Sequence, residues 1–246
     1  LINDFLAEAT RLGRGEEDIE LWKLDLKGAY TLMSFAAKDV RLMASELPGE
    51  LIVFFLCCTF GSRATPFAFQ VITLSLVWEL THGTNSSGAR HIWGQILMYV
   101  DDIIGISFKC NVAHDMAATK TLCEALLGPG AVADDKSDHG VTLEVIGYTI
   151  SLATQRVGIA RKNICRALYA AFAVQVEGHN RLKAMQRVAS HASRYKTVCR
   201  EMAPFARALH QAAKGHFRHA SFTLSADTKR SVWMMRILLI LTEMEG

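Results

Sequence analysis

Two adjacent aspartates between two short apolar segments constrain the fold of this chain more than any other feature. Residues 96–100 and 103–108 are each of strand length, and only Asp101 and Asp102 separate them. Two residues between apolar strands is the spacing of a β-hairpin. We therefore expect an antiparallel hairpin that carries the two carboxylates at its tip.

Neighbouring carboxylates beside apolar residues are electrostatically costly, because ionising both is unfavourable unless a cation is near. A simple tight turn would more naturally use Asn-Gly or Asp-Gly, since type I′ geometry needs positive φ at both positions. Carboxylate oxygens with few His or Cys nearby favour Mg²⁺ or Mn²⁺ over zinc. Asp101 and Asp102 are therefore candidate metal ligands. The alternative is a solvated turn in a structural scaffold.

A third carboxylate lies at the end of another predicted strand. Residues 21–26 alternate in part between apolar and polar, which predicts a strand that ends near Asp25. Two metal ions held by such carboxylates would stabilise the attacking and leaving oxygens of a phosphoryl transfer. The sequence thus predicts Asp25, Asp101 and Asp102 as catalytic residues that ligate two Mg²⁺ (or Mn²⁺) ions.

The rest of the first 160 residues predicts a mixture of strands and helices. The continuous apolar run at 51–59 predicts a buried strand. Thr65 and Pro66 predict a helix start, with Thr65 as the N-cap and the helix running to about residue 81. Asn111 is expected to cap a helix that runs to Leu127 and ends at the following glycine.

The C-terminal part of the chain has a helical pattern. Residues 141–152 and 156–160 are expected to form a hairpin, and from Arg161 the pattern is helical to the end. Breaks are expected at 177–180 and 215–223, and Ser225 can cap the last helix. Strands mixed with helices, followed by helices alone, indicate the α+β class, with an antiparallel sheet that helices cover on one face.

Charge is distributed unevenly along the chain. Residues 161–220 contain twelve Lys or Arg and two acidic residues, a net charge of +10, whereas residues 1–160 contain twelve and nineteen, a net charge of −7. A basic segment beside an acidic body with a metal site suits a polyanion partner. A solvated helical face is the alternative explanation.

Composition excludes several other classes. The longest apolar runs, 51–60 and 232–241, are too short to span a bilayer, which needs about 20 residues, and no signal peptide is visible. Six cysteines without a C-x-x-C pair predict reduced thiols in an intracellular protein, cytoplasmic or nuclear and not secreted. The chain does not begin with Met, which suggests a fragment of a longer protein.

Several segments together resemble one protein family. Residues 24–30 (LDLKGAY), 60–70 (FGSRATPFAFQ) and 99–102 (YVDD) are similar, in order and spacing, to the first three palm motifs of reverse transcriptases. Residues 136–137 (KS) and 145–150 (VIGYTI) resemble the lysine segment and the primer-grip hairpin that follow in that family. The resemblance covers about residues 21–160 and is closest to retrotransposon polyproteins of the long-terminal-repeat or tyrosine-recombinase kinds.

The resemblance implies roles for individual residues. Asp25 and Asp101 would be the principal metal ligands, and Asp102 would act less directly. Tyr30 corresponds to the aromatic steric gate that excludes a ribose 2′-OH. The remaining implied contacts are with the nucleotide (Phe60, Gly61, Gln70 and Lys136) and with the primer (Gly147 and Tyr148).

The resemblance also implies a division into two domains. Residues 1–160 would be the palm with residual fingers and the catalytic motifs, and residues 161–246 would be a basic, mainly helical thumb or connection. Basic thumb residues would contact nucleic-acid phosphates without reading bases. The candidates are Arg161, Lys162, Arg166, Arg181, Lys183, Arg187, Arg194 and Lys196.

The implied function is an RNA-directed DNA polymerase that joins a dNTP to a primer 3′-OH on an RNA or DNA template. The first alternative is a catalytically inactive fragment that only binds nucleic acid, because few residues precede Asp25 where the family has its fingers. An RNA-dependent RNA polymerase or a nucleotide cyclase on a similar palm is a further alternative. The sequence does not indicate an oligomeric state.

Overall fold

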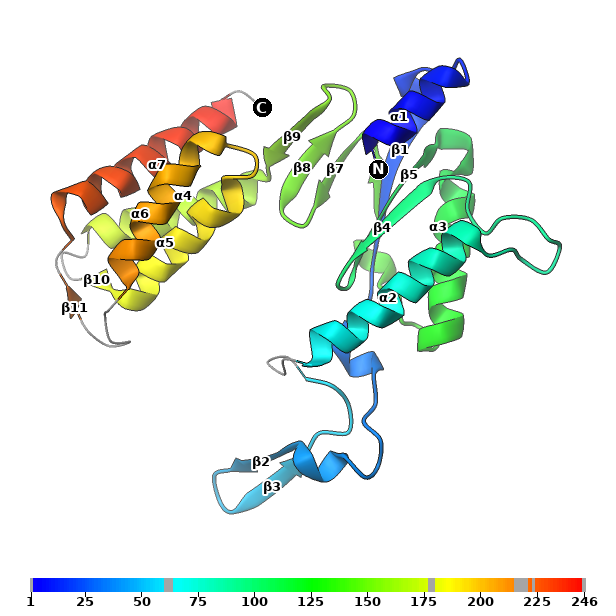
Figure 1. Ribbon diagram of the computed structural model, residues 1–246, viewed down its shortest axis with the longest axis horizontal. Coiled ribbons are helices and arrows are strands. Elements are labelled where there is room, and N and C mark those ends of the chain that lie inside the picture. Colours follow the sequence, from blue (N-terminus) through cyan, green and yellow to red (C-terminus); the bar gives the residue numbers. More distant parts are fainter. Residues whose placement is uncertain (1, 60–63, 177–179, 215–220, 223, 245–246) are drawn as a thin grey trace. The chain divides into compact units, whose positions relative to one another are not determined.

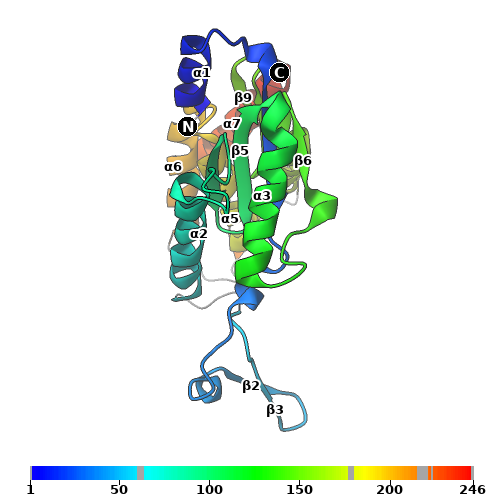
Figure 2. The same ribbon diagram turned by 90° about the vertical axis from the view of Figure 1, so that its right-hand side faces the viewer.

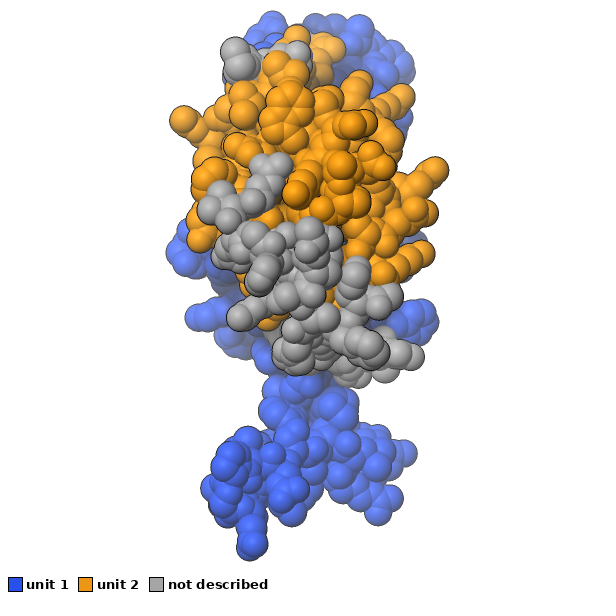
Figure 3. Space-filling view, turned by 90° about the vertical axis from the view of Figure 1, so that its left-hand side faces the viewer, with its two compact units in different colours: residues 1–145, 151–154 blue, residues 146–150, 155–246 orange. Residues whose placement is uncertain are grey.

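The computed structural model describes residues 2–59, 64–176, 180–214, 221–222 and 224–244, and it divides the chain into two compact units (Figure 1). Unit 1 comprises Leu1–Val145 with Ser151–Thr154, and unit 2 comprises Ile146–Ile150 with Gln155–Gly246 (Figure 3). Each unit has a cluster of buried apolar residues of its own.

The centre of unit 1 is a four-stranded sheet with the strand order β4-β5-β1-β6. The strands are β1 (Ile19–Asp25), β4 (Gln95–Tyr99), β5 (Asp102–Phe108) and β6 (Asp138–Gly140). β1 is antiparallel to both β5 and β6, and β4 is antiparallel to β5. The predicted α+β class and the predicted hairpin are both confirmed.

The turn of the β4–β5 hairpin lies one residue earlier than predicted. Asp102 is the first residue of β5 and pairs with Tyr99, so the two loop residues are Val100 and Asp101. The reason is that Asp102 also pairs with Asp25 of β1, which extends β5 by one residue. Val100 has φ 59°, an uncommon conformation for a β-branched residue.

Helices α2 (Ala64–His82) and α3 (Lys109–Leu127) pack on this sheet, and α1 (Ile2–Arg11) precedes it (Figure 2). α2 contacts β4, α3 contacts β1 and β5, and the two helices contact each other. The prediction that Asn111 caps α3 is wrong, because β5 passes into the helix at Phe108 without a side-chain cap. Gly128, with φ 102°, ends α3 as predicted.

A buried polar network joins α3 to the sheet. Trp22 Nε1 donates to Ser107 Oγ at 2.9 Å, and Ser107 Oγ donates to Asp115 Oδ2 at 2.6 Å. The fully buried Asp115 also accepts the backbone N–H groups of Trp93 at 3.0 Å and Gly94 at 2.8 Å. The network therefore fixes the position of α3 against β5 and the segment that leads into β4.

The predicted buried strand at 51–59 is exposed. β2 (Ala44–Leu47) and β3 (Leu51–Phe54) form an isolated two-stranded antiparallel hairpin, and Leu51 and Ile52 are each 62% exposed. An apolar run of strand length predicts burial only when another layer covers the strand. In the described parts of the chain, β2 is the sole strand paired with β3. Short helices η2 (Ala29–Leu32) and η3 (Val40–Leu42) precede the hairpin.

The division between the units falls within a small antiparallel sheet. Its strands are β7 (Thr142–Val145), β8 (Tyr148–Ser151) and β9 (Arg156–Ile159), in that order. The prediction placed one hairpin here with residues 141–152 as a single strand, but Ile146 and Gly147 interrupt that segment as a turn between β7 and β8. The short helix η4 (Asp134–Lys136) lies before β6.

Unit 2 consists mainly of four α-helices. These are α4 (Arg161–Val176), α5 (Leu182–Tyr195), α6 (Ala203–Ala213) and α7 (Ala226–Met244), with η5 (Arg200–Met202) and the short pair β10 (Asn180–Arg181) and β11 (Ser221–Phe222). The predicted cap of α7 is confirmed, since Thr228 N donates to Ser225 Oγ at 3.2 Å. None of the described helices combines the length and apolarity needed to cross a bilayer.

Candidate active site

The three predicted aspartates lie at one end of the unit 1 sheet. Asp25, the last residue of β1, is directly opposite Asp102, the first residue of β5. Leu26 N donates to the carbonyl of Asp101 at 2.9 Å, which fixes the adjoining turn against the end of β1. Residues far apart in sequence are therefore brought together by strand register.

Lys136 also lies at this end of the sheet. Ala133 N donates to the carbonyl of Asp25 at 2.8 Å, and Lys27 N donates to the carbonyl of Ala131 at 2.7 Å, so the segment before η4 runs along the end of β1. Lys136 Nζ consequently lies 2.6 Å from Asp25 Oδ2. The hydrogen bond and the charge of Asp25 raise the pKa of Lys136.

Negative charge is concentrated around Asp102. Burial raises the pKa of Asp102, and the nearby charges of Asp101 and Asp25 raise it further, whereas Lys23 and Lys136 lower it. Lys23 was not among the predicted site residues. Its position two residues before Asp25 on the same strand places both side chains on one face of the sheet, which is the signal that could have identified it.

The donor chemistry of this site suits a hard divalent cation. Three carboxylates could supply oxygen ligands, and burial together with the two neighbouring charges disfavours ionisation of Asp102 in the absence of added positive charge. In the described residues, however, no group of three or more His, Cys, Asp or Glu side chains is arranged around one ion position. Lys136 meanwhile supplies positive charge to Asp25, so metal ligation by Asp25 would compete with this ion pair. The metal ions remain a prediction.

The predicted nucleotide contacts differ in their surroundings. Tyr30, in η2, is only 8% exposed, and its ring packs edge-on against Phe69 with centroids 5.6 Å apart. Gln70 is exposed on α2. Phe60 and Gly61 lie outside the described residues. The roles of all four residues remain predictions.

The predicted primer-grip residues Gly147 and Tyr148 belong to unit 2. The Tyr148 hydroxyl donates to the carbonyl of Arg194 at 2.8 Å, and the Arg194 guanidinium donates to the carbonyl of Ile146. Arg194, predicted to contact phosphates, therefore already has a protein partner.

Other predicted phosphate contacts are on the helix surfaces. Arg161 has a side chain that is 85% exposed and is paired with Glu243 at 2.9 Å. The structure leaves Lys162, Arg166, Lys183, Arg187 and Lys196 exposed, and the side chain of Arg181 lies outside the described set.

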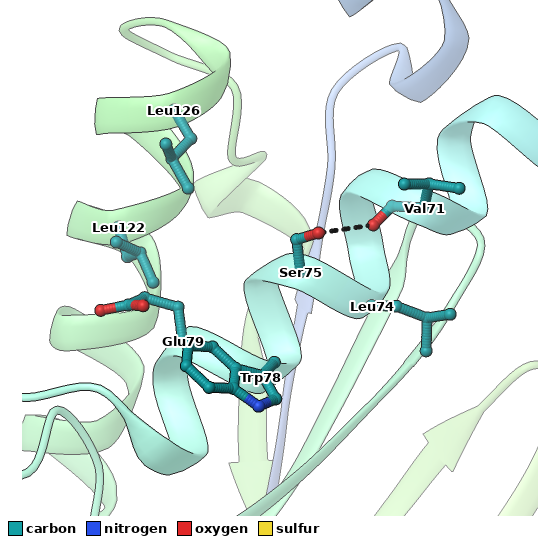
Figure 4. Close-up of a pocket in the computed structure, with 7 residues that line it drawn as sticks. All are labelled: Val71, Leu74, Ser75, Trp78, Glu79, Leu122 and Leu126. Carbon is teal, nitrogen blue, oxygen red and sulfur yellow. Dashed lines mark hydrogen bonds between the residues drawn. The ribbon is translucent and has the colours of Figure 1, made fainter.

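A separate apolar hollow of about 710 Å³ lies between α2 and α3 (Figure 4). Leu74 and Trp78 of α2 and Leu122 and Leu126 of α3 line it, with Glu79 as its acidic group. None of the predicted site residues takes part in this lining.

The chain has a reverse transcriptase-like fold, with an antiparallel sheet that has carboxylates at its end, the covering helices α2 and α3, and a helical second unit. Among solved structures, the chain is similar to the foamy viral protease-reverse transcriptase in complex with RNA/DNA hybrid. The TM-score is 0.60 and the identity 14%, over 90% of this chain and 27% of that one.

Two further structures of the foamy viral enzyme have the same fold. The form called dRH, in complex with double-stranded DNA, has a TM-score of 0.58 and 14% identity, over 89% of this chain and 35% of that one. Another complex with double-stranded DNA has a TM-score of 0.57 and 15% identity, over 90% and 42%. The chain thus spans less than half of these proteins. No family model and no curated protein matches the sequence.

Proposed function

We propose that this chain belongs to an RNA-directed DNA polymerase of retroelement type, which transfers a nucleotide from a dNTP to a primer 3′-OH. The observation that carries the proposal is the pairing of Asp25 with Asp102 across β1 and β5, with Asp101 in the adjoining turn and Lys136 Nζ 2.6 Å from Asp25. These residues belong to the segments that resemble the palm motifs and the lysine segment of reverse transcriptases.

Each residue has a distinct task in the proposed reaction. Asp25 and Asp101, with a lesser contribution from Asp102, would hold two divalent ions. Two such ions supply charge that stabilises the attacking and leaving oxygens of the phosphoryl transfer. Lys136 would leave Asp25 and place its ammonium near the triphosphate, where it stabilises developing negative charge. Tyr30 would exclude nucleotides that carry a 2′-OH.

The proposed partner is a template with an annealed primer. The similar foamy viral structures contain RNA/DNA hybrid or double-stranded DNA. In this chain, exposed basic side chains on α4 and α5 would bind the phosphate backbone of such a duplex. This partner suits a polymerase that accepts any base sequence, because phosphate contacts carry no sequence information.

Primer extension on an oligo-dT/poly-rA template tests the proposal, with Mg²⁺ and separately with Mn²⁺. We expect metal-dependent extension that Asp25→Asn and Asp101→Asn abolish, while Asp18→Asn, which removes an exposed carboxylate of unit 1, extends normally. Extension that survives both site variants would refute the assignment of these carboxylates.

A non-catalytic nucleic-acid-binding protein is the second candidate. It is favoured by the absence, among the described residues, of a preformed three-ligand metal cluster, together with the Lys136–Asp25 ion pair. This candidate predicts template–primer binding that survives Asp25→Asn and Asp101→Asn, with no extension in either metal. The same primer-extension experiment, with a binding measurement added, separates the two functions.

A further inference from the structure

The turn between β7 and β8 has an unfavourable sequence for its conformation. Ile146 has φ 49° and Gly147 has φ 80°, so both loop residues have positive φ, as in a type I′ turn. Such turns favour Asn-Gly, because a β-branched side chain is poorly tolerated at positive φ. The surroundings of Ile146 must therefore hold this conformation in place.

Two side chains of unit 2 hold the turn by its carbonyl groups. The guanidinium Nη2 of Arg194 donates to the carbonyl of Ile146. The buried Asn163 donates through Nδ2 to the carbonyl of Gly147 at 3.0 Å, and Ala160 N donates to the same carbonyl at 3.2 Å. Asn163 lies in the first turn of α4 and Arg194 in the last turn of α5, so two helices fix one turn.

Tyr148, the residue after the turn, is bound by the same helix end. Its hydroxyl donates to the carbonyl of Arg194 at 2.8 Å, and Thr197 Oγ1 donates to that carbonyl at 2.9 Å. The Arg194 guanidinium carbon lies 5.7 Å from the centre of the Tyr148 ring, and the ring meets the buried Tyr195 edge-on at 6.5 Å. Arg194 thus contacts both the turn and the aromatic side chain that follows it.

The ends of two side chains approach Gly147 closely. A Cβ atom there would lie 2.4 Å from Asn163 Nδ2 and 2.9 Å from Arg194 Nη2. Glycine suits this position because of its positive φ, and a larger residue would displace the ends of the Asn163 and Arg194 side chains.

We infer that Arg194 and Asn163 are positioning residues for the primer terminus. They hold the Ile146–Gly147 turn in one conformation, so that Gly147 and Tyr148 present a fixed surface to the primer end. The inference rests on the proposed function and on the primer contact that the resemblance to reverse transcriptases implies for Gly147 and Tyr148. It assigns Arg194 to the turn, in place of the phosphate contact that the sequence predicted.

The test compares Arg194→Ala with Arg207→Ala, which removes the same charge from an exposed position of α6. A template–primer with 2-aminopurine at the primer 3′ end reports the local environment of the terminus, and extension is measured on the same duplex. We expect Arg194→Ala to slow extension of bound primer by about tenfold and to change the fluorescence, with duplex affinity nearly unchanged. Arg207→Ala should behave as wild type in all three measurements.

A second-site change distinguishes this role from general structural damage. Asparagine adopts positive φ readily, so Ile146→Asn should stabilise the turn without help from Arg194. We therefore expect Ile146→Asn to restore most of the extension rate to Arg194→Ala. If Arg194→Ala does not fold, as judged by thermal melting, Arg194→Lys replaces it, because lysine keeps the charge but loses the planar donor group.

The possible outcomes test the positioning role of Arg194 and the polymerase function separately. Normal extension and unchanged fluorescence in Arg194→Ala would overturn the inference while the polymerase assignment stands. A second outcome for Arg194→Ala is weakened duplex binding with a smaller salt dependence, but normal extension of the duplex that remains bound. This outcome would show that Arg194 contacts a phosphate, and it would also overturn the inference. If the wild-type chain binds the duplex without extending it, the polymerase function fails, and the fluorescence change alone decides the positioning role.

Discussion

At the scale of single residues, the most consequential side chain outside the carboxylate site is Asp115. It is fully buried, and its carboxylate accepts hydrogen bonds from Ser107 Oγ and from two backbone N–H groups. A buried carboxylate is stable only when its acceptor capacity is used in this way. Of its partners, Ser107 is fully buried as well, so solvent does not readily replace the acceptor of that hydroxyl.

Replacing Asp115 by alanine should destabilise unit 1 strongly. The change leaves the buried Ser107 hydroxyl and the part-buried N–H groups of Trp93 and Gly94 without their acceptor, at about 1–3 kcal/mol for a fully buried group and less for the other two. We expect a loss of about 3 kcal/mol or more in the free energy of unfolding, measured by urea denaturation. Asp18→Ala, at an exposed position, is the control and should change stability by less than about 0.5 kcal/mol. A loss for Asp115→Ala as small as the control would show that the network contributes little.

Tyr30 combines a structural and a proposed functional role. Its ring is buried against Phe69, so Tyr30→Ala should cost about 3 kcal/mol of stability. If Tyr30 is also the steric gate, the same change should raise ribonucleotide incorporation relative to deoxynucleotide by about tenfold or more, equivalent to about 1.4 kcal/mol of discrimination. The control Tyr30→Phe keeps the ring and should retain discrimination. Unchanged selectivity in Tyr30→Ala, measured by competitive primer extension, would rule out the gate.

At the scale of elements, sequence spacing predicted the β4–β5 hairpin, because two residues between apolar strands leave few other arrangements. It did not predict the register, which depends on the pairing of Asp102 with Asp25 on a distant strand. Likewise, the apolar run in β3 predicted a strand, but its exposure depends on which layers cover it. Local pattern determines the type of element, whereas tertiary pairing determines its position and burial.

The same distinction explains what was predictable in the candidate site. The motifs predicted Asp25, Asp101 and Lys136 as site residues, and the structure brings Asp25 Oδ2 and Lys136 Nζ within 2.6 Å. Arg194 could not be assigned from sequence, because a basic residue on a helix looks the same whether it binds a phosphate or a backbone carbonyl. Asp115 was not predicted either. It lies on the buried face of α3 with Val112 and Thr119, at helical spacing, and this spacing was the signal that could have identified it.

Helix α4 begins with two basic residues, Arg161 and Lys162, and has no acidic residue in its first turn. The N-terminus of a helix carries partial positive charge, so basic residues there reduce stability by about 0.3–1 kcal/mol each. The ion pair of Arg161 with Glu243 offsets part of this cost, and the proposed anionic partner would offset more of it. We therefore expect Lys162→Glu to raise the melting temperature slightly and, at the same time, to weaken template–primer binding. The two effects are measured by thermal unfolding and by fluorescence anisotropy; a variant that loses both stability and affinity would contradict this explanation.

At the scale of the whole molecule, the uneven distribution of charge along the chain would govern association with the proposed polyanion. The net charge is only +3, but residues 161–220 carry +10 and residues 1–160 carry −7. A nucleic-acid duplex would therefore be attracted by one segment and repelled by the other, which favours binding through the basic helices. Because phosphate binding releases counterions, the affinity should fall steeply as salt concentration rises.

The salt dependence of affinity in single-substitution variants measures how many of these side chains contact phosphates. On a logarithmic plot of affinity against salt concentration, each lost contact with duplex DNA reduces the slope by about 0.9. We expect this reduction for Arg166→Ala and for Lys196→Ala, both exposed in the structure, and about twice as much for the double variant. Arg194→Ala should leave the slope unchanged, because its guanidinium is bound to the carbonyl of Ile146. Equal slopes for wild type and the double variant would show that the duplex binds to another surface. A reduced slope for Arg194→Ala alone would show that Arg194 contacts a phosphate.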